Sequence, residues 1–120
     1  MRKRSFFYDF NLGVVSKKRQ IHLSLPVDSV SKATLVVLEK MRARIFRPLD
    51  NSGSISGYKG WSVLSDGEVI AVTISKDEIE DGSNILIQST SAFPKLWDWG
   101  VNNRNLNKFE KLFREIVYRP

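Results

Sequence analysis

Hydrophobic and polar residues alternate in short stretches along the chain, which is the pattern of β-strands with one buried face. The first two stretches cover residues 6–12 and 21–25, and Pro26 ends the second. Gly13 and the basic residues 17–19 lie between them. These two stretches are therefore predicted to form a β-hairpin with a basic tip.

Three further stretches have strand periodicity: residues 58–64, 68–75 and 84–90. The Asp66-Gly67 pair between the first two of them is typical of a tight hairpin turn. A short extended piece is expected at residues 45–46. Residues 50–57 are rich in glycine and serine, so they are predicted to form a loop within the domain.

Two other segments repeat their apolar residues at helical spacing and are predicted to be amphipathic helices, over residues 29–43 and 103–118. Each has an apolar stripe that should face the core. The stripes comprise Val30, Ala33, Val37 and Met41, and then Leu106, Phe109, Phe113, Ile116 and Val117. Helix caps are expected from side chains near each start: Asp28 or Ser29, and Asn102 or Asn103.

These elements predict one α+β domain spanning residues 1–120, in the order β-β-α-β-β-β-α. A curved antiparallel sheet of about five strands would carry both helices on one face. The length of 120 residues suits a single hydrophobic core and leaves little room for a second. Residues 1–4 are mostly basic and can form a disordered arm outside the core.

The amino-acid composition excludes several kinds of catalytic and metal-binding site. The chain has no cysteine, which excludes disulfides, thiol catalysis and cysteine-ligated zinc. Its single histidine, His22, excludes metal sites that need two, and we expect His22 to be exposed or hydrogen-bonded on the polar side of its strand. We therefore predict no metal and no cofactor. Since no apolar stretch is long enough to cross a bilayer and no signal-peptide pattern follows the basic start, a cytoplasmic location is predicted.

Residues that could carry catalysis are sparse. Four acidic residues crowd one predicted turn, where a solvated role is expected rather than the opposed carboxylates of a hydrolase: Asp77, Glu78, Glu80 and Asp81. The chain has neither a glycine-rich phosphate loop nor a nucleophile elbow. We therefore assign no catalytic residue, and an enzyme that uses Asp98, His22 or the acidic turn remains an alternative.

The chain carries 19 lysines and arginines against 13 acidic residues, a net charge of +6, and its basic residues are unevenly spread. They concentrate in the arm, at the hairpin tip, at the end of the first helix and on the last helix. The candidate anion-binding residues are Lys17, Lys18, Arg19, Arg42 and Arg44. If these groups share one face, their field would attract nucleic acid or an anionic surface.

The segment before the last helix is the most unusual local feature, because Trp97 and Trp99 flank Asp98. An exposed indole there would anchor a partner or a ligand, whereas buried indoles would close one end of the core. Gly100 allows the chain to turn into the helix. The candidate ligand-binding or partner-binding residues are Trp97, Asp98, Trp99, Asn102 and Arg104.

The same region resembles the closing strand, loop and helix of small bacterial α+β domains of unknown function. The likeness rests on the serine-rich residues 89–91, followed by Asp98-Trp99-Gly100-Val101-Asn102. In those domains an arginine follows the asparagine directly, whereas Asn103 here delays Arg104 by one residue. The resemblance supports the fold and implies no particular activity.

These observations together favour a non-catalytic binding or interaction module, with a small molecule or a protein as its partner. A binder of nucleic acid or anionic surfaces, acting through the basic groups, is the second hypothesis. An enzyme of unknown type is the third.

Overall fold

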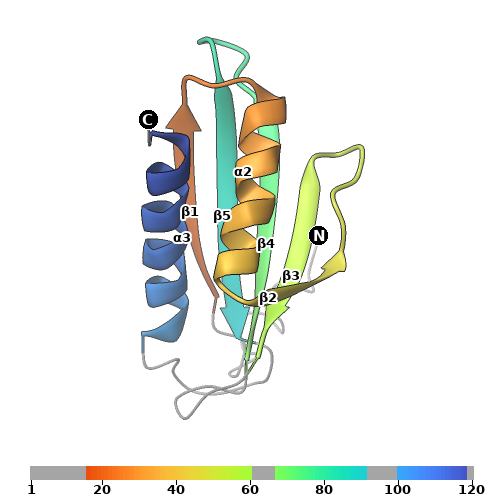
Figure 1. The fold of residues 1–120 in the computed structure, drawn as a ribbon, viewed down its shortest axis with the longest axis vertical. Helices are drawn as coiled ribbons and strands as arrows, with labels where there is room; N and C mark the ends of the chain where they lie inside the picture. Colours follow the sequence, from red (N-terminus) through yellow and green to blue (C-terminus); the bar gives the residue numbers. More distant parts are fainter. Residues whose placement is uncertain (1–15, 61–66, 92–99, 119–120) are drawn as a thin grey trace, which may run out of the picture.

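The described β-strands form one antiparallel sheet in the computed structural model, which describes residues 16–60, 67–91 and 100–118 (Figure 1). The strands lie in the order β1-β5-β4-β3-β2, so β1 and β2 are the two edges. In chain order the elements are β1 (Ser16–Leu23), α2 (Val27–Lys40), β2 (Ala43–Arg47), β3 (Ser54–Lys59), β4 (Glu68–Lys76), β5 (Ser83–Ser91) and α3 (Val101–Val117). Both helices cover the same face of the sheet, which confirms the predicted α+β architecture.

The covered face of the sheet is buried because its strands turn apolar side chains inward at every second position. In β4 and β5 these inward residues are Ile70, Val72, Ile74, Ile85 and Ile87. Against them α3 packs Leu106, Phe109 and Phe113, and the rings of Phe109 and Phe113 stack with their centroids 5.8 Å apart. The two apolar stripes therefore face the core as predicted, with Ile116 and Val117 partly buried at its margin.

Both helices begin earlier than predicted, and no side-chain cap fixes either start. α2 begins at Val27 after Pro26, and α3 begins at Val101 after Gly100, whose φ of +75° confirms the predicted turn at this glycine. The predicted caps are wrong, because all of these residues lie inside a helix: Asp28, Ser29, Asn102 and Asn103. Neither helix of the described segments is long and apolar enough to cross a membrane.

Strand β1 contains the residues predicted to form a hairpin tip. Residues 17–19 pair with β5 in continuous antiparallel register, so the predicted turn at these residues is wrong. The partner strand of that hairpin, predicted over residues 6–12, lies outside the described residues.

Strand β3 begins halfway through the glycine- and serine-rich stretch of residues 50–57 that was predicted to be a loop. The chain turns only around residues 50–53, where the Asp50 carboxylate accepts hydrogen bonds from the backbone N–H groups of Ser52 and Ser54, at 2.9 and 3.1 Å. A glycine is favoured at position 57 of this strand because a Cβ there would lie only 3.2 Å from the Cβ of Ala43 on β2. Small residues thus allow β3 to pair closely with β2, although the composition of this segment alone suggests a loop.

Candidate functional site

The inward face of the sheet changes from apolar to polar toward the lower end in Figure 1, where β5 ends and α3 begins. Lys59, Glu68 and Ser91 are register partners there, one from each of β3, β4 and β5. Ser89 takes the next inward position on β5. Glu68 and Ser89 occupy the same side of their strands as the isoleucines of the core, so polar groups replace apolar ones at buried positions.

A continuous hydrogen-bonded network joins β4 and β5 to α3. Asn105 Nδ2 donates to Glu68 Oε1 at 2.9 Å and to Ser89 Oγ at 3.0 Å. Ser89 Oγ in turn donates to Asn102 Oδ1 at 2.6 Å, and Asn102 Nδ2 donates to Ser91 Oγ at 3.2 Å. We call these five residues the polar network, and all of them are buried, with Glu68 only 2% exposed.

Burial of this network has a free-energy cost, and it also restricts the side chains to one arrangement. A buried polar group costs free energy unless it is hydrogen-bonded, and a carboxylate costs more than a hydroxyl or an amide. Each bond of the network therefore helps to hold its side chains in one arrangement. Such fixed, dehydrated polar groups are what a binding site requires in order to orient a ligand.

The polar network opens into a pocket of about 300 Å³ between the sheet and the first half of α3. Its lining comprises Lys59, Gly60, Glu68, Val101, Arg104, Asn105 and Lys108. The four lining residues from α3 follow one another at spacings of three, one and three, which places them on one face of the helix. Three of the lining side chains are basic and one is acidic.

Two of the predicted binding residues belong to this region. Asn102 is a member of the polar network, and Arg104 lines the pocket. The other three, Trp97, Asp98 and Trp99, lie outside the described residues. Their assignment to a binding site stays a prediction.

Sequence reasoning missed Lys59, Glu68 and Asn105. A signal for Glu68 exists, because it continues the alternation of Ile70, Val72 and Ile74 into a charged residue. Asn105 similarly lies on the buried side of α3, directly before Leu106. A polar residue in phase with a core stripe is the feature that identifies both.

The predicted anion-binding residues form two groups on opposite edges of the sheet. Lys17 and Lys18 are exposed on β1, whereas Arg42 and Arg44 lie at the start of β2. Four strand spacings separate these edges, which is about 19 Å across the sheet. Arg42 and Arg44 are thus close to each other at the β2 edge, but the structure does not bring them together with the β1 lysines.

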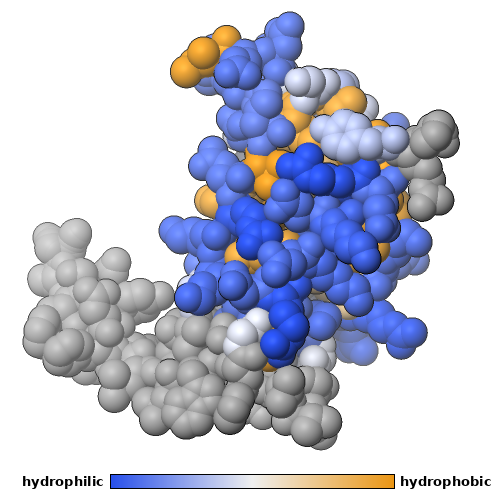
Figure 2. Space-filling model, turned by 90° about the vertical axis from the view of Figure 1, so that its left-hand side faces the viewer, coloured by the Kyte–Doolittle hydropathy of each residue, from blue (hydrophilic) through white to orange (hydrophobic). Residues whose placement is uncertain are grey.

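Arg19 forms an ion pair within the protein instead of facing outward alone. Its Nη1 lies 3.1 Å from Glu110 Oε1 on α3, and Arg114 Nη2 lies 2.9 Å from Glu110 Oε2. Partial burial raises the pKa of Glu110, but the hydrogen bonds from Arg114 and Arg19 outweigh this and lower it below 4.5. Figure 2 shows that mostly hydrophilic side chains cover this side of the molecule, over α3 and β1.

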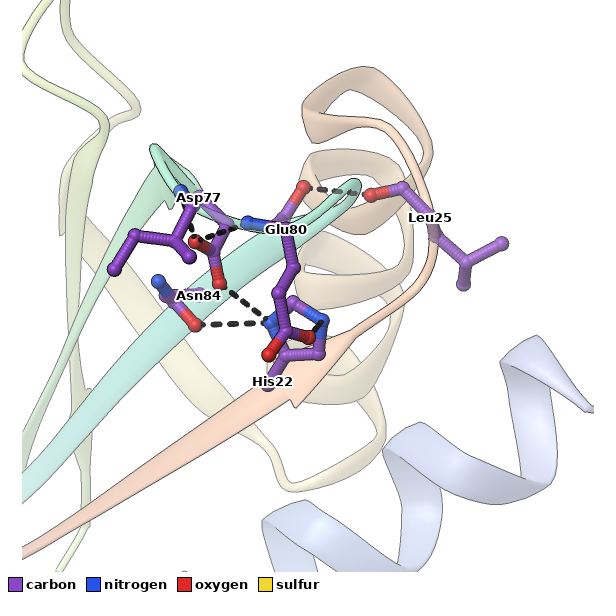
Figure 3. A network of polar contacts seen from close by, with 7 residues as sticks. His22, Leu25, Asp77, Glu80 and Asn84 are labelled. Carbon is purple, nitrogen blue, oxygen red and sulfur yellow. Dashed lines mark hydrogen bonds and ion pairs between the residues drawn. The ribbon is translucent and has the colours of Figure 1, made fainter.

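The single histidine lies at the opposite end of β1, in a cluster of polar contacts (Figure 3). His22 Nδ1 is 2.9 Å from Asp77 Oδ2 and 3.2 Å from Asn84 Oδ1, while Nε2 is 3.5 Å from Glu80 Oε1. The backbone N–H groups of Ile79 and Glu80 donate to Asp77, and with the nearby His22 they lower the pKa of its carboxyl group. The expected hydrogen bonding of His22 is present. In the described ranges no group of three His, Cys, Asp or Glu residues is placed to hold a metal ion.

A larger pocket, of about 490 Å³, lies near this histidine where β1 leads into α2. Its charged lining residues, Asp28, Lys76 and Asp81, are all exposed to solvent. Hydration of such side chains lowers their value for recognition, because the ligand must compete with water. The smaller pocket is therefore the stronger candidate, since a buried network forms part of its wall.

Comparison with known proteins defines the fold more than the activity. No family model and no curated protein sequence matches the chain. An uncharacterized protein from Rhizobium leguminosarum superposes with a TM-score of 0.54 at 12% identity, covering 89% of this chain and 96% of that one. The crystal structure of Ara h 8.0201 superposes with a TM-score of 0.52 at 12% identity, covering 89% of this chain and all (100%) of that one. The chain is thus similar in fold to these two small α+β proteins.

Proposed function

We propose that this protein is a non-catalytic module that binds a small molecule in the pocket beside the polar network. The observation that carries this proposal is a network of five buried, hydrogen-bonded polar residues at core positions, two of which, Glu68 and Asn105, line one pocket. Binding sites are where proteins accept polar residues in positions that stability alone would fill with apolar ones.

The site is also held firmly enough to act as a preformed receptor. Glu68 and Ser89 sit on neighbouring central strands, and Asn105 belongs to a helix anchored by the buried Phe109 and Phe113. A receptor whose groups are already oriented loses less entropy when a ligand binds. The pocket volume of about 300 Å³ lies at the small end of the range for ligand sites.

The chemistry of the described pocket favours binding over catalysis. Its one carboxylate, Glu68, is held by the amide of Asn105, and the described lining contains no histidine. The histidine of the chain is remote, because its register partner Asn84 lies seven residues before Ser91 on β5, about 24 Å along the strand. General acid–base catalysis requires its groups within hydrogen-bonding reach of one another or of the substrate.

The test is an NMR titration of the ¹⁵N-labelled protein with three probes of similar size: phenylacetate, phenethylamine and 1-phenylethane-1,2-diol. These present an anion, a cation and a neutral diol. The proposal expects at least one probe to shift amide signals of residues 59–60, 67–68 and 101–108. Shifts confined to other regions, or no shift with any of the three, would contradict it.

A matched pair of variants on α3 sharpens this test. Asn105 is buried in the pocket wall, whereas Asn107 is exposed and does not line the pocket. Asn105→Leu should abolish the shifts produced by an active probe, and Asn107→Leu should leave them unchanged. Thermal unfolding of both variants separates a lost site from a lost fold.

A further inference from the structure

Resting on the proposed function, we propose that the ligand is a small organic anion that carries a hydroxyl or amino group beside its charged end. Two separate features of the pocket wall are complementary to these two groups. The basic side chains at the rim would attract the negative charge, and a buried amide oxygen would accept a hydrogen bond from the hydroxyl or amino group.

The rim of the pocket is positively charged from two directions. Lys59 ends β3 and Lys108 lies on α3, so their ammonium groups approach the pocket from the sheet and from the helix. Neither lysine forms an ion pair with another described residue. Arg104 adds a third positive charge, which leaves the lining at a net charge of +2 when Glu68 is ionised. An anion placed there would be attracted by the net positive charge of the lining, to which the two lysines contribute without an ion pair to any described residue.

The donor requirement comes from Asn105. Both N–H groups of its amide are directed at acceptors, Glu68 and Ser89, and a carboxylate can only accept, so the orientation of the amide is fixed. Its carbonyl oxygen Oδ1 has no hydrogen-bond partner among the described residues, although the side chain is only 3% exposed. Buried acceptors are rarely left unpaired in folded proteins. A hydroxyl or amino group of a ligand in the pocket would supply the missing donor.

The size of the pocket limits the rest of the molecule. A volume of about 300 Å³ corresponds to about ten water molecules in the liquid. Val101 and Gly60 offer a short apolar wall next to the charged groups. The ligand class is therefore a compact hydroxy acid or amino acid rather than a long acyl chain.

The experiment compares four probes by NMR titration of the full chain: mandelate, phenylacetate, 1-phenylethane-1,2-diol and inorganic phosphate. Mandelate has both required groups, phenylacetate lacks the hydroxyl, the diol lacks the charge, and phosphate tests a bare anion. We expect mandelate to bind about tenfold more tightly than phenylacetate, the effect of one well-formed hydrogen bond in a buried site. The diol and phosphate should bind more weakly still.

The outcomes separate this inference from the proposed function. Equal or tighter binding of phenylacetate, the diol or phosphate at the pocket would overturn the ligand class while supporting a small-molecule site. No binding of mandelate would overturn the class as well. If none of the probes used here or in the first titration shifts the pocket signals, the proposed function fails with it.

Lysine variants test the charge requirement on folded protein. Lys59→Gln and Lys108→Gln alter side chains at the rim and should each weaken mandelate binding about fivefold, with a smaller dependence on salt concentration. Lys111→Gln is the matched control, because Lys111 is an exposed lysine of the same helix that does not line the pocket. Unchanged mandelate affinity in both rim variants would overturn the role assigned to the lysines.

Discussion

Ser89 occupies the middle of the polar network and links its two asparagines. Its hydroxyl group accepts a hydrogen bond from Asn105 and donates one to Asn102. Removal of this group would take one hydrogen bond from each of the two buried asparagines. The network therefore depends on a side chain whose own volume is small.

Ser89→Ala is expected to lower the free energy of unfolding by about 1–3 kcal/mol, the cost of leaving buried polar groups unsatisfied. Urea denaturation monitored by circular dichroism measures this difference. Ser75→Ala, at an exposed position of β4, is the control and should stay within about 0.5 kcal/mol of the wild type. Equal stability of the two variants would mean that the network bonds contribute nothing.

Glu110 makes a second residue-scale prediction, which concerns pH. Its pKa is lower in the folded protein than the ordinary value of 4.5, so the folded state binds the proton less readily than the unfolded state. The ion pairs of Glu110 therefore stabilise the fold above pH 4.5, and this stabilisation is lost as the pH falls through the folded pKa. Arg19→Gln removes one of the two pairs.

Arg19→Gln should cost less than about 1 kcal/mol at pH 7, because the pair is partly exposed. The difference from the wild type should shrink as the pH is lowered below 4.5. Urea unfolding at a series of pH values measures it. Lys18→Gln, on the outward side of the same strand, serves as the control without a pH-dependent difference. A pH-independent loss in Arg19→Gln would contradict the assignment to Glu110.

At the scale of whole elements, α3 serves two purposes along its length. Its second half is an apolar anchor, in which Phe109 and Phe113 are fully buried against the sheet. Its first half carries the polar face that includes Asn102 and Asn105. The anchor positions the amides relative to the strands, so the geometry of the site follows from the packing of the core.

The connection between β4 and β5 depends on a glycine. Gly82 has a φ of +119°, and a Cβ added there would collide with the carbonyl oxygen of Leu23 on β1. Gly82→Ala should therefore destabilise the protein by more than about 1 kcal/mol in thermal or urea unfolding. Gly60 is the control: it is exposed, and an added Cβ meets no atom within 4 Å. If Gly82→Ala is no less stable than Gly60→Ala, the backbone constraint assigned to Gly82 is absent.

The sequence predicts the helices and the two central strands well because each has a strong internal period. The apolar stripe that contains Phe109 indicates the buried face of α3, and the alternation that contains Val72 indicates the buried face of β4. β3 was predicted only in its last two residues, which begin the strand expected over residues 58–64. Its first four residues were predicted to be a loop because of their serines and glycine, and only the neighbouring strand explains why a small residue is needed at Gly57.

The site is harder to predict than the fold, because its residues are brought together by register. Lys59, Glu68 and Ser91 come from three strands, and no local pattern says that they are opposite one another. Asn102 and Arg104 were identified only through the unusual segment before the last helix. What the sequence does offer is the phase of Glu68 and Asn105, each a polar residue in line with core positions.

At the scale of the whole molecule, the two ends of the sheet are polar for different reasons. At one end, His22 and Asp77 tie the β4–β5 connection to β1 in an exposed, acidic setting. At the other end, a buried network opens into a positively charged pocket. The predicted anion-binding residues of the described segments are divided between the two edge strands, about 19 Å apart across the sheet.

The most direct measurement is the NMR signal of the Asn105 side-chain amide during a titration with mandelate. That amide lies in the pocket wall, and its oxygen is the acceptor assigned to the ligand. The account predicts that its two N–H signals move together with the backbone signals of residues 101–108 and saturate at the same mandelate concentration. If those side-chain signals stay in place while mandelate saturates the protein elsewhere, the polar network serves only the fold, and the pocket is not the binding site.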